Sequence, residues 1–170
     1  MNAQNNTWDT VFDWLDKAIE AVLFIIVIVM LTSGLAQVFF RYVIQSSLSW
    51  SEELMRYLYV WMTMIGAALA IRKNQFTVIE TFKNLIRAKS ALAGTVLYVF
   101  ITGLMLGFFV LLTFWGWRVA SVNFFQNSPA MGISMGGAYL ALPIGGVLGI
   151  LYTLISVRDY VRKSREVQAS

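Results

Sequence analysis

The sequence predicts an all-α membrane protein with four transmembrane helices, short interfacial amphipathic helices, and N- and C-termini in the cytoplasm. Of its 170 residues 58% are hydrophobic, and the mean hydropathy is +0.67. The apolar share of soluble domains is lower, roughly 45 to 50%. Charged residues make up 13% of the chain and stand between long apolar runs. No Pro- or Ser-rich linker divides the sequence, so we expect residues 1–170 to form a single membrane domain.

The first predicted span covers residues 19–42. No charge interrupts the 20 residues between Glu20 and Arg41, and this length crosses a hydrocarbon core at ~1.5 Å per residue. Acidic residues precede the span, whereas a cleavable signal peptide begins with basic ones. Residues 8–18 lead into it and predict an interfacial amphipathic helix, because apolar side chains follow one helical stripe: Trp8, Val11, Phe12, Leu15 and Ile19.

The second predicted span, 50–71, begins with charged residues. Ser49-Trp50-Ser51-Glu52 fits the capping-box pattern, in which the Ser49 hydroxyl and the Glu52 carboxylate accept backbone N–H groups at a helix start. Arg56 follows Glu53 by three residues and Glu52 by four, which favours an ion pair on the helix surface. Docking of an outside partner is the alternative role. Acid–base catalysis is not expected, because neighbouring helical positions point about 100° apart.

Two further spans are predicted at 90–117 and 131–157, bounded by Lys89, Arg118 and Arg158. A second interfacial helix is predicted at 76–87, where apolar residues again form a stripe. Polar residues and a proline mark the connection before the fourth span. Pro143 is expected to bend that span, which membranes tolerate.

The distribution of basic residues predicts the orientation. Ten Lys and Arg fall in the N-terminal tail, the connection between spans two and three, and the C-terminal tail, whereas Arg41, Arg56 and Arg118 belong to the opposite side. Cytoplasmic segments are enriched in Lys and Arg, so both termini are placed inside. Arg41 and Arg118 complement helix C-termini, where cations are favourable. Alternatively they steer an extracytoplasmic partner.

The composition also excludes several kinds of chemistry. The chain has neither cysteine nor histidine, which removes disulfides, imidazole bases and the usual haem or zinc ligands. We therefore expect no catalytic, cofactor-binding or metal residue in this chain, and the scattered basic residues do not indicate nucleic acid. No ionisable residue stands near the middle of a predicted span, whereas transporters and channels usually keep such groups there. Small-residue patterns such as Gly103-x-x-x-Gly107 and Gly145-x-x-x-Gly149 predict close helix packing, within the chain or with another subunit.

Two motifs resemble a known family. Trp50-Ser51-Glu52-Glu53-Leu54-x-Arg56-Tyr57, followed by Trp61 and Gly66-Ala67-Ala68, is similar to the second span of the small membrane subunit, DctQ type, of tripartite ATP-independent periplasmic (TRAP) transporters. Residues 127–136, with Ser128-Pro129-Ala130, and residues 139–145 resemble that family's loop and fourth span. The likeness covers most of residues 18–160. Ser134 departs from it, because the family commonly has a proline there.

The resemblance implies a non-catalytic subunit of the bacterial inner membrane that scaffolds a larger multi-span permease subunit. That partner would carry the sodium and substrate sites, and a periplasmic binding protein would deliver an organic acid such as sialic acid or a C4-dicarboxylate. Membrane lipids would surround the helices. Within the motifs that carry the resemblance, the candidate docking or structural residues are Trp50, Glu52, Glu53, Arg56, Trp61, Ser128, Pro129 and Ala130. The charges at the outer span ends add Arg41 and Arg118 as candidates.

Two other functions remain as alternatives. A four-helix membrane anchor for a redox enzyme is the first, although a chain without histidine cannot bind haem through two imidazoles. A self-contained channel is the second, and it would need a polar pore lining that the predicted spans do not provide.

Overall fold

The structure, a computed structural model, describes residues 5–46, 48–73 and 91–169, and side chains within 12–46, 48–73 and 94–158. Helix α1 (Asn5–Phe39) continues into a π-helical turn, η1 (Phe40–Ile44). Helices α2 (Ser49–Arg72), α4 (Ala91–Asn123), α5 (Gly136–Tyr139) and α6 (Ala141–Ala169) follow. The predicted interfacial helix at 76–87 lies outside the described residues. The described elements are helical, which confirms the all-α fold class.

Four segments are long and apolar enough to cross a membrane: Phe12–Ile44, Ser49–Arg72, Val96–Asn123 and Gly136–Arg158. The number of spans is therefore the predicted one, and the helices extend beyond several of the predicted bounds. Residues 8–18, predicted as a separate interfacial helix, belong to the same continuous helix as the first span. The sequence offers no Gly or Pro to end a helix between them, so hydrogen bonding continues.

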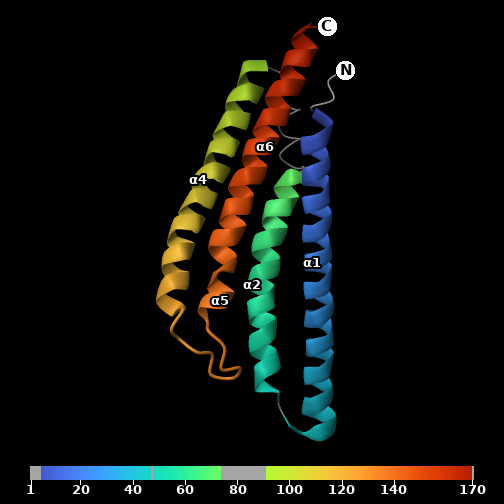
Figure 1. The fold of residues 1–170 in the computed structure, drawn as a ribbon, viewed down its shortest axis with the longest axis vertical. Coiled ribbons are helices and arrows are strands. Elements are labelled where there is room, and N and C mark those ends of the chain that lie inside the picture. Colours follow the sequence, from blue (N-terminus) through green and yellow to red (C-terminus); the bar gives the residue numbers. More distant parts are fainter. Residues whose placement is uncertain (1–4, 47, 74–90, 170) are drawn as a thin grey trace.

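The four long helices lie side by side in one layer, in the order α1, α2, α6, α4 (Figure 1). Helix α1 packs on α2, α2 on α6, and α6 on α4. The central helices are better covered than the edge helices. Of the most apolar 18 residues in each span, 39% are buried in α6 and 6% in α4. A small core cluster forms around α2, α4 and α6 from Ala68, Ile71, Phe109 and Tyr152.

Glycines allow the close approach of α6 to its two neighbours. A Cβ on Gly145 would lie 2.7 Å from Met64 Cβ of α2, and one on Gly149 would lie 2.4 Å from the Phe109 ring of α4. This confirms packing within the chain for that pattern. Gly103 and Gly107 differ, because a Cβ there would meet no atom within 4 Å.

Pro143 lies in the first turn of α6, just after an interruption of the fourth span. Helix α5 ends at Tyr139, Leu140 forms a turn, and α6 begins at Ala141. Proline has no N–H to donate to the carbonyl four residues earlier, which accounts for the interruption at this point. The proline ring packs against α4, where a Cβ on Gly116 would lie 3.1 Å from Pro143 Cδ.

Candidate functional site

The polar side chains that connect different helices gather at the two ends of the layer. Both chain termini lie at one end, called here the termini end, and the connections after η1 and α4 lie at the other, the loop end (Figure 1). The Glu53 cluster (Glu53, Tyr57, Ser128 and Ala130) belongs to the loop end. The Asp16 cluster (Asp16, Glu20, Arg72, Lys73 and Tyr152) belongs to the termini end.

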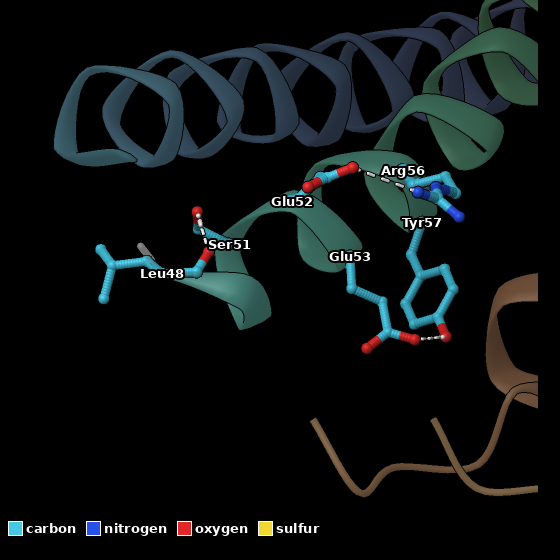
Figure 2. A network of polar contacts seen from close by, with 6 residues as sticks. All are labelled: Leu48, Ser51, Glu52, Glu53, Arg56 and Tyr57. Carbon is cyan, nitrogen blue, oxygen red and sulfur yellow. Dashed lines mark hydrogen bonds and ion pairs between the residues drawn. The ribbon is translucent and has the colours of Figure 1, made fainter. Parts of the chain in front are cut away.

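Glu53 joins the two motifs that the sequence singled out. Its Oε1 accepts a hydrogen bond from Tyr57 Oη (2.6 Å), and its Oε2 accepts one from the backbone N–H of Ala130 (3.1 Å), 77 residues away. The Ser128 hydroxyl lies next to the same carboxylate. Figure 2 shows Glu53 and Tyr57 projecting from α2 toward the connection before α5. One carboxylate thus satisfies a backbone donor of the loop and holds it against α2.

Hydrogen bonds within the chain order this connection, residues 124–135. Ser128 N–H donates to Ile133 O (2.8 Å), Met135 N–H donates to Gln126 O (2.9 Å), and Asn127 forms a β-bridge with Ser134. The buried Ser128 hydroxyl accepts from Met131 N–H (3.1 Å). Gly132 adopts φ +68°, a left-handed conformation that glycine reaches without strain. The turn is therefore closed by its own backbone and held to α2 by Glu53.

Ser134 stabilises the same turn although the resemblance would place a proline here. Its hydroxyl donates to Phe124 O (2.6 Å) and accepts from Gly136 N–H (3.2 Å). These two bonds tie the end of α4 to the start of α5, so the turn stays ordered without the proline ring.

The predicted capping box does not form. The N-cap residue of α2 is Leu48, and no side chain caps the backbone N–H groups at this helix start. The Ser51 hydroxyl donates to Leu48 O (3.0 Å; Figure 2). Glu52 forms an ion pair with Arg56, whose Nη2 lies 3.4 Å from Glu52 Oε1. The predicted ion pair is present, and both side chains are mostly exposed, at 65% and 71%. Pairs this exposed contribute little to stability.

Some of the remaining candidate residues contact other parts of the chain, and the others are exposed. Trp61 Nε1 donates to Gly137 O (3.2 Å) and so joins α2 to α5. Arg118 lies over the Trp115 ring, 5.4 Å from its centroid, a cation–π contact on the outer surface of α4. Trp50, Arg41 and Pro129 are exposed, and the structure brings none of these three into the Glu53 cluster.

The Asp16 cluster was not predicted as a site. Arg72 Nε of α2 lies 3.4 Å from Asp16 Oδ2, and Tyr152 Oη of α6 donates to Asp16 Oδ1 (2.7 Å). Lys73 forms an ion pair with Glu20, one turn further along α1. The sequence held a signal, since Asp16 and Glu20 share a helix face and Arg72 and Lys73 end the adjacent span. The signal was missed because Asp16 was assigned to the polar face of a surface helix.

The polar groups of both clusters are paired with one another. In the Glu53 cluster the acceptor is occupied by a tyrosine hydroxyl and a backbone N–H, and in the Asp16 cluster carboxylates meet cations. Such arrangements position helices and loops, and the exposed aromatic and basic side chains around the loop end are suited to contacts with other molecules.

Comparison with known proteins gives consistent results. Residues 28–163 match the family described as tripartite ATP-independent periplasmic transporters, DctQ component. The chain is 30% identical over 136 residues to a Haemophilus influenzae protein named as a TRAP transporter small permease protein, covering 79% of this chain and 82% of that one. It is 26% identical over 160 residues to the sialic acid TRAP transporter small permease protein SiaQ of Vibrio cholerae, covering 92% and 91%. Over 77 residues it is 35% identical to the sialic acid TRAP transporter permease protein SiaT of H. influenzae, 45% of this chain and 11% of that one.

Proposed function

This chain belongs to the DctQ-component family of tripartite ATP-independent periplasmic transporters, and from this we propose that it is a non-catalytic scaffold for the large permease subunit. The protein is a multi-pass protein of the inner membrane, with four helices able to span it. In the proposal, the transporter is coupled to sodium and takes up an organic acid. Sialic acid is the first substrate to test, because the V. cholerae relative carries it in its name. A C4-dicarboxylate is the second.

The distribution of charge supports a scaffold. Residues 21–40, 57–71, 96–117 and 136–157 contain no Asp, Glu, Lys or Arg, whereas proteins that move ions or acids through themselves usually keep such groups at membrane depth. Large apolar side chains are exposed along both edge helices, including Phe24, Leu35, Phe100 and Phe114. Helices of this kind offer van der Waals surface to lipid and to other transmembrane helices.

A large permease partner is supported by one of the relatives. The similar segment makes up only 11% of the SiaT protein, so in that protein a stretch like this chain is covalently continuous with a much longer permease. We propose that the same association is made here between separate chains, and that a periplasmic binding protein delivers the substrate to the assembled pair.

The proposed orientation places the loop end in the periplasm and both termini in the cytoplasm, following the excess of Lys and Arg near the termini end. Because the natural chain has no cysteine, single cysteines test this directly. Asn127→Cys at the loop end should react with a membrane-impermeant maleimide on intact cells, and Ser164→Cys should react only after lysis. The reverse pattern would refute the orientation.

The scaffold proposal is tested by reconstitution. Proteoliposomes receive the large subunit and the binding protein, with or without this chain, and sodium-driven uptake of labelled sialic acid is measured. Uptake should require this chain, and full uptake without it would refute the proposal. A C4-dicarboxylate assayed in parallel identifies the substrate class.

A narrower experiment tests whether the loop end receives the binding protein. Reversing the charge of Arg41, Arg56 and Arg118 should slow uptake at low ionic strength and matter less at high salt, because exposed charges mainly accelerate encounter. Lys17→Glu, an exposed reversal at the opposite end, is the matched control. Equal uptake by the triple variant and the control at low salt would remove the docking role.

A further inference from the structure

We propose that Asp16 is a latch that fixes the tilt of the edge helix α1 within the layer, by bonding at once to the neighbouring helix α2 and to the next helix, α6. This device is independent of the proposed transport role, because it concerns how the chain holds its own helices. A charged partner from α2 and a polar partner from α6 meet at this one carboxylate of α1.

The two carboxylate oxygens of Asp16 have different partners. Oδ2 lies 3.4 Å from Arg72 Nε at the last residue of α2, and Oδ1 accepts a 2.7 Å hydrogen bond from Tyr152 Oη of α6. Helix α2 lies between α1 and α6 in the layer, so the tyrosine reaches past the end of α2. Tyr152 is 2% exposed and belongs to the core cluster. Asp16 is thereby attached to a side chain that is itself fixed by packing.

The rest of α1 is weakly held by packing. Only 11% of the most apolar 18 residues of its span are buried, and among residues 12–39, where side chains are described, Ile26 and Ser33 are the buried ones. In a bilayer, apolar contact between helices brings no gain over contact with lipid tails, so association depends on close packing and on polar bonds. For α1 the close packing is limited, and the polar bonds are concentrated at the termini end.

A second contact supports the latch one turn away. Glu20 follows Asp16 by four residues on the same face of α1 and pairs with Lys73, the residue after Arg72. Two carboxylates of α1 therefore face two cations at the C-terminal end of α2, and the four charges balance. Cations are also favoured at this end of α2 by its helix dipole.

The latch and the loop-end contact of α1 lie far apart. Asp16 and Gly34 are 18 residues apart along α1, about 27 Å at the rise of a helix, and Gly34 lies next to Met55 of α2. With the contact at Gly34 kept, loss of the latch lets the termini end of α1 move away from α2. The latch therefore sets the tilt of α1 through the position of its termini end.

Crosslinking of the full-length chain in native membranes tests this inference, since every cysteine is introduced. Glu20→Cys with Lys73→Cys replaces the second contact and reports proximity of α1 and α2 at the termini end, using a short bis-methanethiosulfonate reagent. Gly34→Cys with Met55→Cys is the matched pair toward the loop end, where a Cβ on Gly34 would lie 3.5 Å from Met55 Sδ. Each pair is combined with Asp16→Ala, Asp16→Asn or Tyr152→Phe.

We expect Asp16→Ala to lower the yield of the termini-end pair at least threefold, with a smaller decrease for Asp16→Asn and Tyr152→Phe, which each keep part of the cluster. Asp13→Asn, an exposed carboxylate three residues earlier, should leave the yield unchanged. The exchange Asp16→Arg with Arg72→Asp should restore it. The Gly34–Met55 pair shows that each variant is inserted and paired. An unchanged termini-end yield in Asp16→Ala, while the Gly34–Met55 pair still crosslinks, would overturn the latch.

Discussion

The two ends of the layer each use one carboxylate to join segments that are distant in sequence, but the partners of the two carboxylates differ. Asp16 meets a guanidinium and a phenol on other transmembrane helices, whereas Glu53 meets a phenol on its own helix and a backbone N–H of the loop. The first arrangement relates helices to one another, and the second orders a turn. The difference indicates that the Asp16 cluster fixes the arrangement of the helices and the Glu53 cluster fixes the shape of the loop.

Removing one member of the Asp16 pair should have the largest effect. Arg72→Met leaves Asp16 without its cation in a largely buried site, and breaking such a pair costs about 3 kcal/mol. We expect a clear decrease in the midpoint of thermal unfolding in detergent. Replacing both members, Asp16→Leu with Arg72→Met, should recover about half of the loss, because no charge is left unpaired but the Tyr152 hydroxyl loses its acceptor. A double variant as unstable as the single one would contradict a role based on charge pairing.

Glu53→Ala should release the loop while leaving the helices in place. The Ala130 amide then loses its charge-assisted bond, and its hydrogen exchange should accelerate about tenfold. Glu53→Gln keeps an acceptor oxygen and should show a smaller increase. Amides in the middle of α6 serve as the internal control. If they accelerated as much as the Ala130 amide, Glu53 would hold the helices as well as the loop, and the contrast between the two ends would fail.

Tyr152→Phe isolates one bond of the Asp16 cluster. The side chain keeps its place in the core, and only the hydrogen bond to the carboxylate is removed. The expected loss is about 1.5 kcal/mol of unfolding free energy, typical of a bond to a charged group. Tyr98→Phe provides a comparison with a longer bond to a neutral acceptor, 3.4 Å from Ser156 O. Equal losses in the two variants would mean that the charge on Asp16 adds nothing.

The exposed pair at the loop end should have the smallest effect. Glu52→Gln removes the partner of Arg56, but both side chains are mostly exposed, and such pairs contribute little. The unfolding midpoint should change by no more than about 1 °C. A larger decrease would show that this pair is part of the structural framework at the loop end.

The sequence predicted the helices because their signal is local. Apolar runs of membrane length and the charges between them identify four spans without knowledge of any contact. The role of Glu53 could not be obtained in this way. Both of its motifs were recognised, but the bond from Ala130 joins positions 77 residues apart, and only the packing of α2 against the α5 region brings them together.

Asp16 shows how a local pattern can mislead. It stands among other charged residues near the start of α1, in a stretch with the stripe of a surface helix. Its partners come from the ends of two other spans, which periodicity cannot reveal. The capping box failed for a related reason. Its residues were suitable, but Glu52 had a second partner one turn ahead in Arg56, and that contact formed instead.

The single layer of helices has a consequence for how such a sequence can change. In a single layer, a side chain on either edge helix faces a neighbouring helix of this chain on one flank only. Along the outward flanks of α1 and α4, one apolar residue can replace another with little effect, and divergence should accumulate there. The glycines of α6 are constrained by both neighbouring helices, because Gly145 packs against α2 and Gly146 and Gly149 pack against α4. The packing of the central helices therefore constrains the sequence most, and the outward flanks of the edge helices can change with the lipids or proteins that surround them.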